Sequence, residues 1–166
     1  MKYILIIVSI MIVLNADYQY ETTSDEINWD VVIEEYIYDS TKAMIEQLNL
    51  YYETSRELVL AVIDASVVYD VPIDIIVSLI FIESSFYQYA VSHKGALGYM
   101  QINPRVWQVD MDKIFCAYYN IDKGVSILRY YKNRSNSWES ALIRYNGWVS
   151  GSQFGRNVLK IKEGIS

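Results

Sequence analysis

Pro72-Ile73-Asp74-Ile75-Ile76-Val77-Ser78-Leu79-Ile80-Phe81-Ile82-Glu83-Ser84-Ser85 is the segment around which we expect the chain to fold. Its residues are apolar on nearly every side of a helical wheel, which predicts a helix buried all round rather than one with a single apolar stripe. Pro72 suits the first turn of such a helix, and Asp74 adds a carboxylate near its positive end. The helix should run to about Ser85 and carry Glu83 at its C-terminal end.

Helical periodicity continues on both sides of this segment and strand signals are weak, so the predicted fold is mainly α. Before the segment we expect one or two amphipathic helices within residues 27–49 and another within 53–69, ending near Val71 because a residue before proline disfavours helical backbone. After it, we expect a turn or short helix over 104–112, one helix or a helix pair over 112–132, a helix over 137–145, and a last short helix over 154–162.

The N-terminus has the pattern of a secretory signal. Met1-Lys2, the apolar run 3–14 and Asn15-Ala16-Asp17 supply a basic start, an apolar region and a small residue at the cut. We therefore expect residues 1–16 to be a signal peptide and the protein to be exported to the periplasm or cell envelope. The run is short for a membrane span, which needs about 20 residues. Leu14 is unfavourable before a cleavage site, so an uncleaved anchor is the alternative.

The 166 residues suffice for one hydrophobic core. We expect an acidic N-terminal helical extension over 17–54 and the main domain over 55–166.

Residues 17–90 contain 15 acidic residues against Lys42 and Arg56, whereas 11 basic residues follow position 90. The second half could face an anionic polymer or be an ordinary solvated surface. The net charge of −6 argues against a nucleic-acid partner. Cys116 is the only cysteine, so no internal disulfide can form, and we expect it to be a small buried hydrophobe.

Glu83 is the candidate for acid–base chemistry. Burial and the negative end of the helix dipole both disfavour its ionised form and so raise its pKa. A glutamic acid that keeps its proton near neutral pH can donate it to a leaving oxygen and later accept one as a base. Position alone leaves an alternative, in which the carboxylate is solvated or pairs with a cation such as Lys94.

The residues that follow Glu83 resemble a known family in identity and spacing. The matching positions, in order, are Glu83-Ser84-Ser85-Phe86, Ala90, Ser92, Gly95-Ala96, Gly98, Met100-Gln101-Ile102, Pro104, Asn120-Ile121, Gly124, Leu128, Ala141-Leu142 and Tyr145-Asn146-Gly147. Over about residues 55 to 165 the chain resembles the soluble lytic transglycosylase-like domain of the goose-type lysozyme superfamily. The resemblance implies a lysozyme-like helical domain with a glycan-binding cleft beside the buried central helix.

By this resemblance the partner is the glycan strand of peptidoglycan, cut between N-acetylmuramic acid and N-acetylglucosamine. Glu83 matches the catalytic acid/base, which protonates the glycosidic oxygen and then deprotonates the muramoyl 6-hydroxyl to leave a 1,6-anhydro end. The substrate supplies the nucleophile, so no second protein carboxylate is needed, unlike in most glycosidases. Tyr145 matches the tyrosine whose hydroxyl hydrogen-bonds the catalytic carboxylate. No cofactor is implied, and His93, the only histidine, has no companions for a metal site, so we expect a solvated loop residue.

The same resemblance predicts the substrate-binding residues. Gln101 and Ser92 match sugar-contacting positions, although loop structure is the alternative for both. Tyr99 replaces the usual leucine and could stack on a sugar or fill space, and Met100 would line the groove or belong to the core. Asn146 completes the set beside Tyr145. Tyr87-Gln88 stands in place of the common Asn-Pro, and neither this departure nor Tyr99 changes Glu83, Gln101 or Tyr145.

Two other functions stay open. A hydrolytic lysozyme on the same fold would need a second carboxylate roughly 6.5 to 9.5 Å from Glu83, and Asp110 and Asp112 are the candidates, unless they cap the next helix. A non-catalytic wall-binding module would use the acidic N-terminal helices to dock a cell-envelope assembly partner, although those residues also suit solvated helix faces. We expect a monomer. The leading hypothesis requires Glu83, Gln101 and Tyr145 to face one groove.

Overall fold

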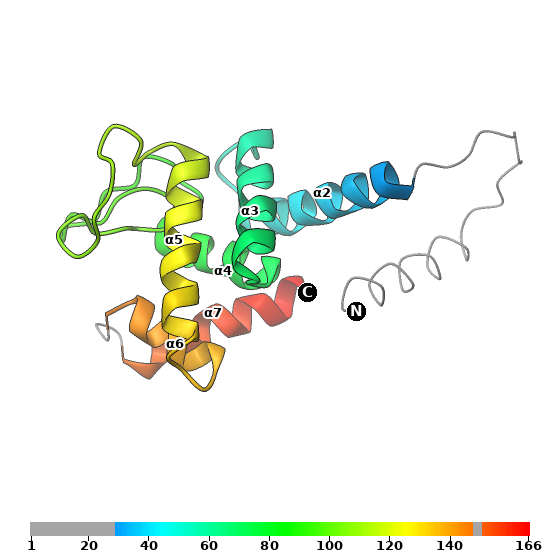
Figure 1. The fold of residues 1–166 in the computed structure, drawn as a ribbon. Helices are drawn as coiled ribbons and strands as arrows, with labels where there is room; N and C mark the ends of the chain where they lie inside the picture. Colours follow the sequence, from blue (N-terminus) through cyan, green and yellow to red (C-terminus); the bar gives the residue numbers. More distant parts are fainter. Residues whose placement is uncertain (1–28, 148–150) are drawn as a thin grey trace, which may run out of the picture. The chain divides into compact units, whose positions relative to one another are not determined.

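The computed structural model describes residues 29–147 and 151–166, so the signal-like segment 1–16 lies outside the described residues. Its elements are α2 (Trp29–Leu48), α3 (Arg56–Tyr69), α4 (Ile73–Ser84), α5 (Ala117–Lys132), α6 (Trp138–Tyr145) and α7 (Ser152–Ile165), shown in Figure 1. Within the described ranges there are no strands, and only two isolated bridges join Leu97 to Val91 and to Ile102. The mainly α fold class predicted from the sequence is confirmed.

The chain divides into two compact units, residues 1–37 and 38–166, with the division inside α2. The larger unit thus begins before residue 55 and includes the second half of α2, where Ile45 is fully buried. The extension predicted over 17–54 and its use as a docking surface stay predictions. None of the helices in the described ranges is long and apolar enough to cross a membrane.

α4 is the buried central helix of the larger unit. Residues 75–80 are all buried, including Ser78, whose hydroxyl donates to the Asp74 carbonyl at 2.7 Å and so leaves no polar atom unsatisfied. Pro72 is the N-cap rather than a first-turn residue, so the helix begins one position later than we expected. Asp74 lies in the first turn, as expected, and pairs with Lys162 at 2.9 Å.

Helices α3 to α7 pack in pairs that bring distant segments together. α3 packs on α4 and α5, α7 packs on α4 and α6, and α5 also packs on α6. The long connection between α4 and α5 stands to the left of α5 in Figure 1, on the side away from α3. The ends of α4 and α6 therefore come close to one loop region, although about sixty residues separate them in sequence.

Three local expectations differ from the structure. Residues 111–116 form turns, so the helix within the region predicted over 112–132 begins only at Ala117. α7 is longer than predicted at both ends. Cys116 was expected to be buried and is exposed, because it is the N-cap residue where the preceding turns meet α5, with its Sγ 3.9 Å from Glu57 Oε1.

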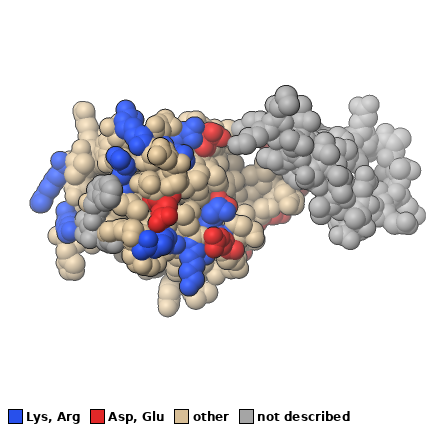
Figure 2. All heavy atoms as spheres, turned by 90° about the horizontal axis from the view of Figure 1, so that it is seen from below, with Lys and Arg blue, Asp and Glu red and all other residues tan. Residues whose placement is uncertain are grey.

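The surface carries charges of both signs. On the face seen in Figure 2, Lys and Arg side chains are spread over the described part of the molecule with Asp and Glu between them, rather than gathered in one patch. The anionic-polymer face considered for the second half of the chain stays a prediction.

Candidate active site

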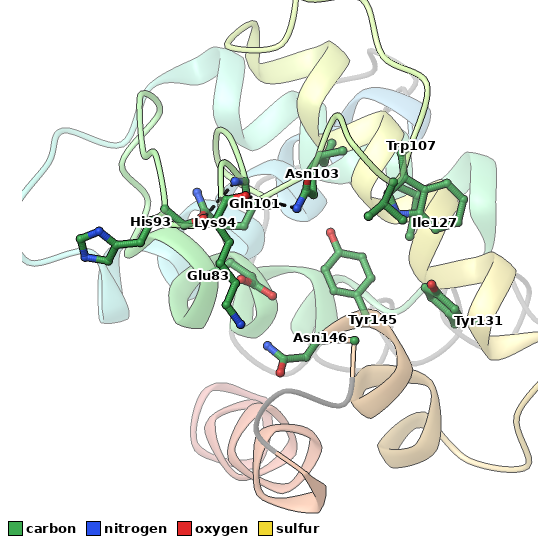
Figure 3. A pocket seen from close by; sticks show the side chains of 15 residues that line it. Glu83, His93, Lys94, Gln101, Asn103, Trp107, Ile127, Tyr131, Tyr145 and Asn146 are labelled. Atoms are coloured by element: carbon green, nitrogen blue, oxygen red, sulfur yellow. Dashed lines mark hydrogen bonds between the residues drawn. The ribbon is translucent and has the colours of Figure 1, made fainter.

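A cleft of about 550 Å³ opens where the end of α4, the end of α6, one face of α5 and the loop residues 92–107 meet (Figure 3). Glu83, Gln101 and Tyr145 all line it. These are the three side chains that the leading hypothesis requires at one groove. Ser92 and Asn146, two of the predicted sugar contacts, line it as well.

The other two predicted sugar contacts pack in the core. Tyr99 is 6% exposed and Met100 is fully buried, and neither is among the described residues that line the cleft. Met100 lies against Gly124 of α5, where an added Cβ would come within 2.6 Å of the Met100 Cγ. The absence of a side chain at Gly124 thus lets α5 approach the loop, and Met100 fills the space between them.

Glu83 has an environment that favours its protonated form. The end of α4 is enclosed by protein, and this desolvation raises the Glu83 pKa from its ordinary value of 4.5 to about 8. None of the ion pairs in the described residues involves Glu83, so the pairing with Lys94 that we considered does not form. Glu83 is therefore mostly protonated at neutral pH, as a general acid must be.

Tyr145 bonds differently from the prediction. Its hydroxyl donates to the backbone carbonyl of Met100 at 2.7 Å, and not to the Glu83 carboxylate. Burial, with the nearby negative charge of ionised Glu83, raises the Tyr145 pKa well above its ordinary range, so the phenol stays neutral. Its oxygen can still accept a hydrogen bond. A protonated carboxyl such as that of Glu83 has the chemistry to donate such a bond, whereas the prediction had the tyrosine hydroxyl as the donor.

The loop that carries Gln101 is held by its own polar groups. The Gln101 side-chain amide donates to the carbonyls of Ala90 and Gly98 at 3.2 and 3.1 Å, and its backbone has a positive φ of 48°. Ser92 Oγ accepts the backbone N–H of Ala96 at 2.9 Å. Both residues thus have the loop-stabilising role that we had weighed as an alternative, and both also line the cleft.

Asn120 anchors this loop from α5. Its fully buried side chain accepts the Met100 N–H at 2.8 Å and donates to the carbonyls of Leu97 and Ile114 at 3.1 and 2.8 Å. Gly98 packs directly on it, because an added Cβ would lie 2.7 Å from the Asn120 Cγ. Asn120 was one of the residues that match the family, but the sequence alone suggested no role for it. In the structure its side chain must both donate and accept hydrogen bonds, which an amide can do.

Aromatic residues of the cleft were missed from the sequence. Trp107 and Tyr131 line it, with ring centroids 6.0 Å apart and planes at 86°. In Figure 3 they lie with Ile127 at the end of the cleft away from His93 and Lys94. One signal was available, because Ile127 and Tyr131 are four residues apart and so share a helix face. Trp107 lies in a turn region without periodicity.

Asp110 and Asp112 do not line the cleft. Asp110 pairs with Lys113 at 3.0 Å and accepts the backbone N–H of Asp112 at 3.1 Å, and the hydrogen bond to Lys113 is the main cause that lowers the Asp110 pKa. Glu83 is the only acidic residue among the described residues of the cleft. In the described ranges no three His, Cys, Asp or Glu side chains group as metal ligands.

Comparison with known proteins gives one family match. The model of the family described as "Transglycosylase SLT domain" matches residues 45–157, which is more than half of the chain and includes every residue of the cleft. This match confirms the resemblance seen in the sequence. No individual curated protein matches the chain significantly.

Proposed function

Because the chain belongs to the transglycosylase SLT domain family, we propose that it is a peptidoglycan lytic transglycosylase that cuts between N-acetylmuramic acid and N-acetylglucosamine. The family generally consists of lytic transglycosylases that act on peptidoglycan. The observation that carries the proposal for this chain is the environment of Glu83 in the cleft. Among the described residues that line the cleft, Glu83 has the only carboxyl group, and desolvation raises its pKa to about 8.

In the proposed reaction Glu83 acts twice. The protonated carboxyl donates its proton to the glycosidic oxygen as the bond from C1 of the muramoyl residue to that oxygen breaks. The resulting carboxylate then stabilises positive charge at C1 and accepts the proton of the muramoyl 6-hydroxyl, whose oxygen closes on C1. The 1,6-anhydro ring forms, Glu83 regains its proton, and no water enters. A single carboxyl therefore suffices.

Tyr145 is proposed to orient Glu83. The Tyr145 hydroxyl donates to the Met100 carbonyl, which fixes the direction of its oxygen lone pairs as acceptors for the acidic proton of Glu83. Such a hydrogen bond fixes the carboxyl without ionising it. Asn103 and Asn146 also line the cleft and add amide groups to its wall.

The sugar contacts follow from the lining residues. The NH₂ group of Gln101 donates to two loop carbonyls. Its amide oxygen can therefore accept a hydrogen bond from an acetamido N–H or a hydroxyl of the sugar. Ser92 and Asn146 are further polar contacts. Trp107 and Tyr131 offer apolar ring surface against which a sugar face can pack. Tyr99 and Met100 would contribute from the core, by supporting the loop.

The alternatives have less support. A hydrolytic lysozyme would need a second carboxylate across the cleft, and Asp110 and Asp112 are engaged in turn contacts outside it. A wall-binding module without catalysis would have no need for a protonated Glu83. A peptidoglycan substrate implies action outside the cytoplasm, in the periplasm or cell envelope. The monomeric state, the cell-envelope assembly partner and the signal peptide stay predictions.

Digestion of purified sacculi tests the proposal. The chain, its Glu83→Gln variant and a matched Glu163→Gln control, which changes an exposed α7 carboxylate, are each incubated with sacculi, and the released muropeptides are analysed by mass spectrometry. We expect anhydro-ended products from the chain and the control, and a loss of about 10²- to 10⁴-fold for Glu83→Gln, the usual contribution of a general acid. Reducing ends in place of anhydro ends, or equal activity of Glu83→Gln, would contradict the proposal.

A further inference from the structure

One tight turn presents two polar side chains at the edge of the cleft. In residues 92–95 the Gly95 N–H donates to the Ser92 carbonyl at 2.9 Å, and Ser92 and Ala96 are joined by a backbone and a side-chain bond, each of 2.9 Å. Gly95 has a φ of +80°, which suits glycine, and the Lys94 carbonyl accepts from Asn103. The turn is thus held at its base, and His93 and Lys94 occupy its exposed tip.

The charge at this tip has no described partner. Lys94 is the only lysine or arginine among the described residues that line the cleft, and none of the ion pairs in the described ranges includes it. The cleft's carboxyl, Glu83, is mostly protonated at neutral pH. Figure 3 shows His93 and Lys94 at the Glu83 end of the cleft, opposite Trp107. One end of the cleft is therefore cationic, and the other is aromatic.

This polarity matches a specific part of the proposed substrate, so the inference rests on the proposed function. N-acetylated sugars are neutral, but a muramoyl residue carries a lactyl ether that ends in a carboxylate or in a peptide with carboxylates of its own. We propose that Lys94, with an N–H of His93, binds the carboxylate borne by the muramoyl substituent and so sets which sugar lies beside Glu83. Both lactyl and peptide carboxylates have the required chemistry.

The expected effect is modest and dependent on salt. An exposed ammonium–carboxylate contact contributes about 0.2 to 1 kcal/mol, which corresponds to about a 1.4- to 5-fold change in Kd. The contact should weaken further as salt screens it. A neutral glycan should gain nothing from it. The dependence on ligand charge therefore distinguishes a carboxylate site from a lysine that merely supports the loop.

Binding measurements test the proposal without cleavage. The whole chain with Glu83→Gln is titrated calorimetrically with three ligands: N-acetylglucosamine oligomers, peptide-stripped glycan strands and peptide-bearing strands. Lys94→Gln is then added to it, and Lys160→Gln, at an exposed α7 lysine outside the described ion pairs, is the matched control. Lys94→Gln should weaken binding of carboxylate-bearing strands by about 1.4- to 5-fold, reduce the salt dependence of that binding and leave binding of the neutral oligomers unaffected. A His93→Ala variant should act in the same direction.

The three ligands also identify the source of the carboxylate. A loss with peptide-stripped strands assigns the lactyl group, and a loss with peptide-bearing strands alone assigns the peptide. An equal loss for neutral oligomers, or no more loss than Lys160→Gln causes, would overturn the proposal. If Lys94→Gln leaves KM unchanged and still yields anhydro products, the carboxylate site is rejected and the proposed function stands. Lys94-dependent binding in a chain that yields no anhydro products would reject the reaction and keep the site.

Discussion

Glu83→Gln is expected to stabilise the protein at alkaline pH while it abolishes catalysis. Desolvation raises the Glu83 pKa from 4.5 to about 8 in the folded chain. Between these two values the folded protein holds a proton that the unfolded chain has released, so the free energy of unfolding falls as pH rises through this window. Glutamine is neutral at every pH, so it does not incur this loss.

The magnitude follows from the shift. Each pKa unit corresponds to about 1.4 kcal/mol, so the rise from 4.5 to about 8 amounts to about 5 kcal/mol. Glu83 keeps some contact with the open cleft, and the resulting hydration lowers the expected value to about 3 to 5 kcal/mol. That is a large share of the roughly 5 to 15 kcal/mol that holds a typical domain folded.

Urea unfolding at pH about 5 and about 9 measures this difference. The free energy of unfolding of Glu83→Gln relative to the unsubstituted chain should increase by about 2 to 4 kcal/mol between the two pH values, because part of the shift already acts below pH about 5. Glu163→Gln, at an exposed site on α7, should show almost no such increase. A Glu83→Gln difference that stays constant within about 1 kcal/mol would refute the claim that Glu83 is held protonated by its surroundings.

Three further results are expected. The kcat/KM for glycan cleavage should fall about tenfold per pH unit above pH about 8, because the acid form of Glu83 is lost there; a profile flat to pH about 10 would contradict this. Gly98→Ala should lower the urea midpoint much more than Gly95→Ala, since both glycines have positive φ but only the Gly98 Cβ meets Asn120; equal losses would contradict the packing. Tyr145→Phe should cost about 1 to 3 kcal/mol of stability, because a backbone carbonyl loses its donor, and should lower kcat more than it raises KM; unchanged kcat would remove its role.

Most helices of the fold could be predicted from local sequence patterns. Helix periodicity placed the starts of α3 and α6 within a few residues, and in the structure the side chains of Ser55 and Ser137 cap these starts through bonds formed within one turn of the chain. The buried nature of α4 was also predictable, since a helix that is apolar all round has no solvent face. The segment before α5 was harder. Its turns are held by contacts between Asp110, Lys113 and Tyr119 that periodicity does not reveal.

The cleft was predictable only in part. Motif spacing predicted that Glu83, Gln101 and Tyr145 share one cleft. It could not show that the Tyr145 hydroxyl donates its hydrogen bond to the backbone carbonyl of Met100. Trp107 and Tyr131 were missed because their meeting depends on how a turn packs on α5. Lone aromatic residues look alike in a chain with 16 tyrosines. Such tertiary contacts become visible only when the elements are assembled.

Digestion of sacculi in heavy-oxygen water tests the central claim most directly, because it asks whether the substrate's own hydroxyl or a water molecule attacks C1. The account predicts anhydro ends without heavy oxygen from the unsubstituted chain, and almost no product from Glu83→Gln. Reducing ends that carry heavy oxygen would show that water is the nucleophile and would contradict the account.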